Sequence, residues 1–178
     1  VDEAAIILKK ALPLLQTFVQ DNLLPIRRQK FIRKLDKLYG QISLTEEEEL
    51  GLYASFGRYG IESFSNYLLR HNRFDQWVAL HQLYKSSIPY LEQCGLKDVV
   101  AQSPETALPL YHYYAMEEIQ QKSRQNYKQA VRIWRAMKNA SKKAGKLDYF
   151  TSYIEAVQQQ FKRLRALQEE MNKSNLLG

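Results

Sequence analysis

The sequence predicts an all-α protein, and three observations support this fold class. Apolar residues recur at steps of three and four along almost the whole chain, and no segment shows the alternation of a half-buried strand. Only 7 glycines and 5 prolines occur among 178 residues, too few for the many turns of an all-β fold. Helix-start residues recur near positions 45, 73, 104, 124 and 147. We therefore expect seven to eight helices joined by short links.

The first helices are predicted in the N-terminal third. A periodic segment covers Val1–Asp21, and Pro13 kinks or restarts it. The next helix covers Ile26–Tyr39, with Pro25 in its first turn and Gly40 after its end. Its expected apolar side consists of Phe31, Leu35 and Leu38, with Ile32 and Tyr39 alongside.

A capping box is predicted at the start of the following helix. The Thr45 hydroxyl can accept a hydrogen bond from the backbone of Glu48, whose carboxylate can reach back to Thr45. Residues 46–49 are all glutamate and lie at the positive end of the helix dipole. We interpret this acidic run as a helix start rather than a metal or partner site.

The remaining helices are predicted from similar signals. Asn72 is expected to cap a helix that carries Trp77 and Ile88, with Pro89 near its end and Gly95 closing it. Ser103 and Pro104 begin the next helix. Two long helices, Asn126–Ala144 and Leu147–Met171, are expected to complete the chain.

Even spacing and short links predict antiparallel helical hairpins, arranged either as a degenerate array like tetratricopeptide repeats or as an irregular bundle. No second copy of a repeat aligns with the first, so both arrangements stay open. Residues 1–178 are expected to form one all-helical domain, a fragment of a longer chain because Val1 is not an initiator methionine. Residues 121–178 are expected to form a basic C-terminal hairpin.

Positive charge is concentrated at the C-terminal end. The net charge is +7. Residues 1–120 hold 13 Lys/Arg and 15 Asp/Glu, a net of −2, whereas residues 121–178 hold 13 and 4, a net of +9. Such asymmetry favours an anionic partner: nucleic acid, an acidic protein or a membrane surface.

The strongest local signal is a basic stripe on the helix predicted over Asn126–Ala144. Residues 122–146 contain no Asp or Glu. The stripe lies opposite an apolar side, and a solvated helix face, or one neutralised by Glu46–Glu49, is the alternative to an anion-binding surface. The six stripe residues are Lys128, Arg132, Arg135, Lys138, Lys142 and Lys146. A secondary basic patch consists of Arg27, Arg28, Lys30, Arg33, Lys34 and Lys37.

Catalytic, metal and cofactor sites are not predicted. The three histidines, His71, His81 and His112, fall on different elements, and Cys94 is the single cysteine. Cys94 follows a helix rather than starting one, so no helix dipole lowers its pKa. Glu117 and Glu118 are explained as helix surface, and no nucleotide-binding or nucleophile motif occurs. Tyr111, Tyr113 and Tyr114 can serve base stacking, but core packing is the simpler explanation.

No membrane span is predicted, because the longest apolar run is Ala4–Leu8. The chain also shows no signal peptide at its start. A lone thiol fits a reducing compartment, so we expect a cytoplasmic protein without a membrane partner.

The last fifty residues resemble the C-terminal tail of bacterial SWIM zinc-finger proteins. The residues that carry the resemblance are Tyr127, Ala130–Arg132, Lys142-Lys143, Phe150, Tyr153 and Phe161–Glu170. The resemblance implies a helical accessory region of a larger bacterial protein, with a zinc finger of the form Cys-x-Cys…Cys-x-His upstream that is proposed to bind DNA or proteins. This sequence has one cysteine, so no residue here is assigned to that finger.

Three functions follow as hypotheses. The first is a non-enzymatic interaction module of a larger cytosolic bacterial protein, which binds nucleic acid or an acidic partner through the basic stripe. The second is a helical-repeat scaffold that binds proteins in a groove and has no nucleic-acid role. The third is an enzyme domain without a recognisable motif.

Overall fold

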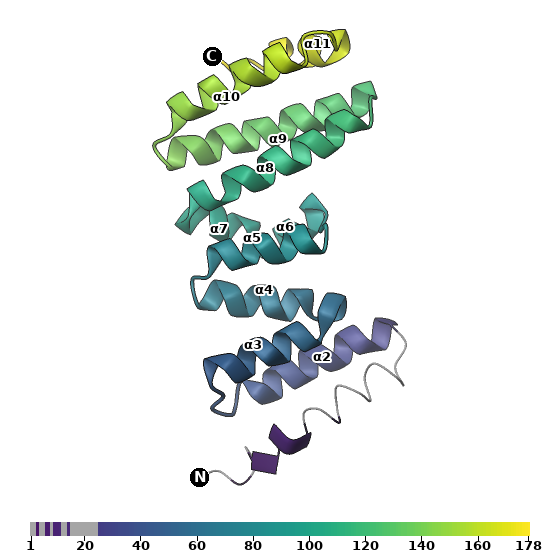
Figure 1. Ribbon diagram of the computed structural model, residues 1–178, viewed down its shortest axis with the longest axis vertical. Coiled ribbons are helices and arrows are strands. Elements are labelled where there is room, and N and C mark those ends of the chain that lie inside the picture. The colour runs from purple at the N-terminus through teal and green to yellow at the C-terminus, as the bar shows by residue number, and fades with distance from the viewer. Residues whose placement is uncertain (1–2, 4–5, 8, 12–13, 15–24) are drawn as a thin grey trace. The chain divides into compact units, whose positions relative to one another are not determined.

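The computed structural model, shown in Figure 1, describes residues 3, 6–7, 9–11, 14 and 25–178. Every regular element in this described part is helical, with ten α-helices and one short 3-10 helix, so the predicted fold class is confirmed and the expected helix number was too low. The helix predicted over Val1–Asp21 falls largely outside the described residues. Contacts divide the chain into two compact units, residues 1–72 and 73–178. Each unit is described by itself below.

The first unit is organised around a small apolar core. Its described elements are α2 (Pro25–Tyr39), α3 (Glu46–Ser55), the 3-10 helix η1 (Gly57–Gly60) and α4 (Ile61–Arg70). The core cluster consists of Ile32, Leu35, Tyr39, Leu52 and Phe56. Leu38 was wrongly expected on this side and is 44% exposed. The steps of three and four from Ile32 through Leu35 to Tyr39 set the buried phase of α2, and Leu38 lies off that phase.

The capping box at the start of α3 is confirmed. The Glu48 backbone N–H donates to the Thr45 hydroxyl oxygen at 3.3 Å, and the Thr45 N–H donates to the Glu48 carboxylate at 2.8 Å. Both contacts satisfy backbone donors that a helix start otherwise leaves unpaired. Hydrogen bonding to the Thr45 backbone is the main reason that the pKa of Glu48 is lowered.

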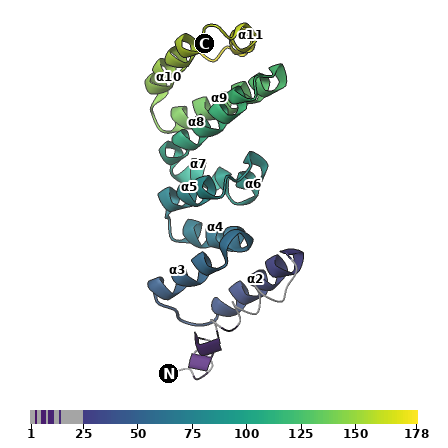
Figure 2. The same cartoon turned by 45° about the vertical axis from the view of Figure 1, so that its right-hand side comes forward.

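The second unit contains seven helices, residues 73–178 being described without a gap. In both Figure 1 and Figure 2, α8 and α9 lie side by side, joined by a turn at residues 121–123, as an antiparallel hairpin. Helix α9 also contacts α10 and α11. The seven are α5 (Phe74–Leu83), α6 (Ile88–Gln93), α7 (Leu96–Gln102), α8 (Pro104–Gln120), α9 (Arg124–Lys143), α10 (Leu147–Gln160) and α11 (Arg165–Lys173).

One side of α9 is buried in the core of this unit. Trp134, Ala130 and Ala140 have no exposed surface. Packing this side against α8, α10 and α11 fixes the rotation of α9 about its axis, so the opposite side faces solvent. The buried residues include the predicted set Tyr127, Ala130, Ile133, Trp134 and Met137.

The single helix predicted between Asn72 and Gly95 is divided in two. Helix α5 ends at Leu83, and α6 begins after Ser87, whose hydroxyl accepts from the Tyr90 N–H at 3.4 Å. Pro89 therefore stands in the first turn of α6, where a missing N–H costs nothing. The Asn72 cap was wrong, since Asn72 adopts a left-handed φ of 55° and Arg73 occupies the N-cap position.

The long helix predicted over Leu147–Met171 was also wrong, because residues 161–164 separate α10 from α11. The side-chain amide of Gln168 donates to the carbonyl of Gln158 at 3.3 Å and to that of Phe161 at 3.1 Å. These bonds satisfy carbonyls that the end of α10 leaves without helical partners. A glutamine inside α11 thus stabilises the break that divides the two helices.

Candidate functional site

Four cations project from the solvent-facing side of α9. Lys128, Arg132, Arg135 and Lys142 are all exposed. No acidic side chain within residues 73–178 forms an ion pair with any of them. Their Cα atoms span about 21 Å along the helix at 1.5 Å per residue. We call these four residues the cationic face.

The other two members of the basic stripe have internal partners. The Lys138 ammonium donates to the carbonyl oxygen of Gly178 at 2.6 Å. Lys146 is paired with Glu105 at 2.6 Å and lies 5.5 Å from the centre of the Tyr149 ring. The hydrogen bond to Glu105 raises the pKa of Lys146. Both ammonium groups are therefore less available to an external anion than the cationic face is.

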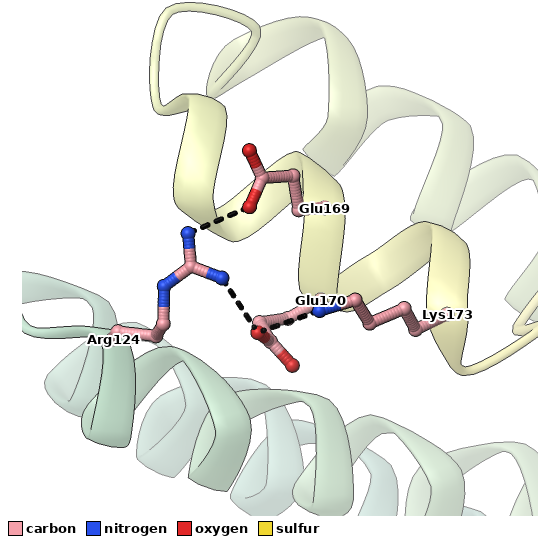
Figure 3. A network of polar contacts seen from close by, with 4 residues as sticks. All are labelled: Arg124, Glu169, Glu170 and Lys173. Carbon is pink, nitrogen blue, oxygen red and sulfur yellow. Dashed lines mark hydrogen bonds and ion pairs between the residues drawn. The ribbon is translucent and has the colours of Figure 1, made fainter.

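An ionic network ties the start of α9 to α11 (Figure 3). The Arg124 guanidinium contacts Glu169 at 2.6 Å and Glu170 at 3.1 Å, and Lys173 contacts Glu170 at 3.6 Å. The hydrogen bond that Arg124 donates to Glu169 raises the pKa of Arg124, and the same bond lowers the pKa of Glu169. Arg124 is thus occupied in holding α11 on α9, and it does not belong to the cationic face.

The secondary basic patch lies on α2, in the unit of residues 1–72. Arg33 pairs with Glu62 at 2.6 Å, and the Arg28 guanidinium lies 5.2 Å from the centre of the Tyr59 ring. Two of the six cations therefore serve contacts within their own unit. The other four, all exposed, are Arg27, Lys30, Lys34 and Lys37.

An open groove of about 690 Å³ runs beside the cationic face, and residues of α6, α7, α8 and α9 line it. Arg132 lines it and so belongs to both features. Apolar side chains form much of its surface, among them Ile88, Leu96 and Ile133. Tyr111 and Tyr114 line it as well, and burial raises the pKa of Tyr114 to about 12, so its hydroxyl stays protonated at neutral pH. We call this feature the α9 groove.

The polar residues of the α9 groove were missed by sequence reasoning. Glu92, Glu118, Asn126 and Gln129 all line it. The Asn126 amide donates to Glu118 at 2.6 Å, and the Asn126 backbone N–H donates to the Ser123 hydroxyl oxygen at 3.1 Å. Glu118 was interpreted as plain helix surface, because nothing in its own segment shows that α6 and α9 approach it. The cluster of Tyr111, Tyr113 and Tyr114 was the feature of the sequence that could have indicated this groove.

The comparisons with known proteins give one relative. The chain is similar to the uncharacterized protein YwqB of Bacillus subtilis (strain 168), with 35% identity over 119 residues. The match covers 67% of this chain and 22% of YwqB, so the chain spans about a fifth of that relative's length. No family model matches the chain. No solved structure gives a significant match.

The titratable side chains of the described residues do not gather into a metal site. No group of three or more histidine, cysteine, aspartate or glutamate side chains is placed to hold a metal ion in the part of the chain that the structure describes. His112 is bonded to the Tyr153 hydroxyl at 2.7 Å, and His71 lies 4.0 Å from Glu49. Cys94 is buried, and its backbone carbonyl accepts a hydrogen bond from the Trp77 indole at 3.1 Å. Nor is any helix among the described residues long and apolar enough to cross a bilayer.

His81 gives the second unit a predictable dependence on pH. Its ring is fully buried between Trp77 and Ser86, and burial lowers its pKa to about 4. An unfolded histidine titrates near 6.5, so below that pH the unfolded state binds more protons than the folded one. We expect the free energy of unfolding to fall by about 3 kcal/mol between pH 7 and pH 4 because of this residue.

Urea denaturation at a series of pH values measures this effect. The His81→Gln variant should lose most of the wild-type pH dependence above pH 4, since the glutamine has no proton to gain. His71→Gln is the control, because His71 is exposed. An unchanged dependence in His81→Gln would contradict the assignment.

Proposed function

We propose that this chain is a non-enzymatic binding module of a larger cytoplasmic bacterial protein, and that it binds nucleic acid through the cationic face of α9. The observation that carries the proposal is the absence of compensating charge. Four exposed cations share one helix face, and within residues 73–178 none has an acidic partner. A surface without internal counter-ions attracts external anions.

The geometry favours a nucleic acid over a compact anion. The cationic face extends about 21 Å in one direction, which matches about six phosphate steps of 3.4 Å along one strand. Its rigid placement also favours such a partner, because α9 is held by core packing and by the Arg124 network. The resemblance of the last fifty residues to SWIM proteins supports only the placement of this chain in a larger bacterial protein. An acidic protein is the alternative partner, and the test must distinguish it from nucleic acid.

Fluorescence anisotropy of labelled duplex DNA, titrated with this chain from about 50 to 200 mM salt, tests the proposal. Four phosphate contacts predict that the logarithm of the association constant falls against the logarithm of salt with a slope of about −3.6. The internal bonds of Lys138 and Lys146 keep these two residues out of the count.

Polyglutamate of matched length is the competitor in the same assay. We expect it to displace DNA poorly, because its flexible chain does not hold negative charges at the fixed spacing of DNA phosphates. Equal displacement by polyglutamate would instead assign the cationic face to an acidic protein. The absence of DNA binding at about 50 mM salt would overturn the proposal.

A further inference from the structure

We propose that the α9 groove receives one unpaired nucleobase of a single strand whose backbone lies on the cationic face, and that it prefers bases with an exocyclic amino group. The inference rests on the proposed function and names the form of nucleic acid that it involves. Arg132 links the two features, since it belongs to the cationic face and also lines the groove. The sugar and base of a nucleotide held at Arg132 therefore begin at the mouth of the groove.

The lining of the groove suits a base better than a phosphate. Glu92 and Glu118 place two carboxylates in it, and like charge disfavours a phosphate there. Apolar side chains, the buried Tyr111 and the half-buried Tyr114 give the groove an uncharged lining with aromatic side chains of the kind on which bases stack. The positive charge of α9 thus favours the phosphate on the cationic face, and the carboxylates and apolar lining favour the base in the groove.

The same carboxylates specify which base fits. Carboxylate oxygens accept hydrogen bonds from exocyclic amino groups, such as that of cytosine, whereas thymine presents a carbonyl oxygen at that position. The Glu118 carboxylate is oriented by the Asn126 amide at 2.6 Å, and the exposed Glu92 carboxylate forms no hydrogen bond within residues 73–178. Both carboxylates are therefore able to act as acceptors toward a base.

The inference requires a single strand. In a duplex each base is stacked and its amino group is engaged by the complementary base, so a base would have to be flipped out before it could enter the groove. The cationic face alone makes no such distinction, because the phosphates of duplexes and single strands are equally accessible to it.

The test compares oligo-deoxycytidine with oligo-thymidine, each about 15 nucleotides long, together with the duplex used above. We expect the chain to bind oligo-deoxycytidine about tenfold more tightly than oligo-thymidine at neutral pH. The double variant Glu92→Ala/Glu118→Ala should reduce this ratio to near one. The ratio is the readout because loss of negative charge raises the affinity for both oligonucleotides alike.

Glu117→Ala is the matched control, since Glu117 is exposed on α8 next to Glu118 but does not line the groove. It should keep the wild-type ratio. Glu92→Ala alone should lower the ratio too, and the exposed side chain that it removes forms no hydrogen bond within residues 73–178 whose loss could perturb folding.

Equal affinity for the two oligonucleotides, or a ratio that the double variant leaves unchanged, would overturn this inference. The proposed function would stand in that case if the duplex still bound with the expected salt slope. If no nucleic acid binds at low salt, both proposals fail together.

Discussion

Replacing Arg132 and Arg135 together by glutamate is expected to weaken duplex DNA binding about 60-fold near 0.1 M salt. Each lost phosphate contact removes about 0.9 logarithmic units at that concentration, so two contacts remove about 1.8. The salt slope should become shallower by about 2, because two fewer counterions are released. Both side chains are exposed on α9, so the substitutions leave the core of the unit unchanged.

A second double variant separates the cationic face from net charge. Lys162→Glu/Arg163→Glu changes the total charge by the same amount, at exposed positions between α10 and α11. It should lower the affinity much less and keep the wild-type slope. Equal losses in the two double variants would mean that binding follows the overall charge of the chain and not the arrangement on α9.

Trp134→Ala is expected to lower the free energy of unfolding of the second unit by about 3–5 kcal/mol. The Trp134 side chain is fully buried, and its indole N–H donates to the Tyr153 hydroxyl oxygen at 3.1 Å, which connects α9 to α10. The truncation leaves a cavity and removes this bond. Burial also raises the pKa of Tyr153 to about 12, which keeps its hydroxyl neutral at physiological pH.

Urea denaturation followed by the fluorescence of Trp77 measures this loss, since Trp77 remains in the variant and lies in the same unit. Tyr149→Ala is the control, because the Tyr149 side chain is 76% exposed and should change stability by less than about 0.5 kcal/mol. A small effect of Trp134→Ala would show that the packing of α9 on α10 contributes little to the unit.

The features that the sequence predicted correctly depend on local patterns. The capping box at Thr45 involves residues three apart, and the apolar side of α9 follows from helical periodicity alone. The placement of Lys128, Arg132, Arg135 and Lys142 opposite that side is a direct consequence of the same period. For these elements tertiary packing agrees with local preference.

The features that were missed depend on contacts between distant residues. The break between α10 and α11 is stabilised by Gln168, whose side-chain amide donates to the carbonyls of Gln158 and Phe161. The spacing of apolar residues does not predict such side-chain hydrogen bonds. The internal partners of Lys138 and Lys146, which are Gly178 and Glu105, lie about forty residues away. The α9 groove likewise combines residues of four helices, so no single segment of sequence predicts it.

The burial of one side of α9 limits how its sequence can vary. Neighbouring residues of an α-helix are about 100° apart, so one inserted or deleted residue near Ala130 would turn everything beyond it by that angle. An insertion would move Trp134 to the exposed position of Arg135 and the charge of Arg132 to the buried position of Ile133. A deletion would move the charge of Arg135 to the fully buried position of Trp134. Substitutions can therefore adjust the cationic face one position at a time, whereas a change in the length of α9 would alter the face and the core together.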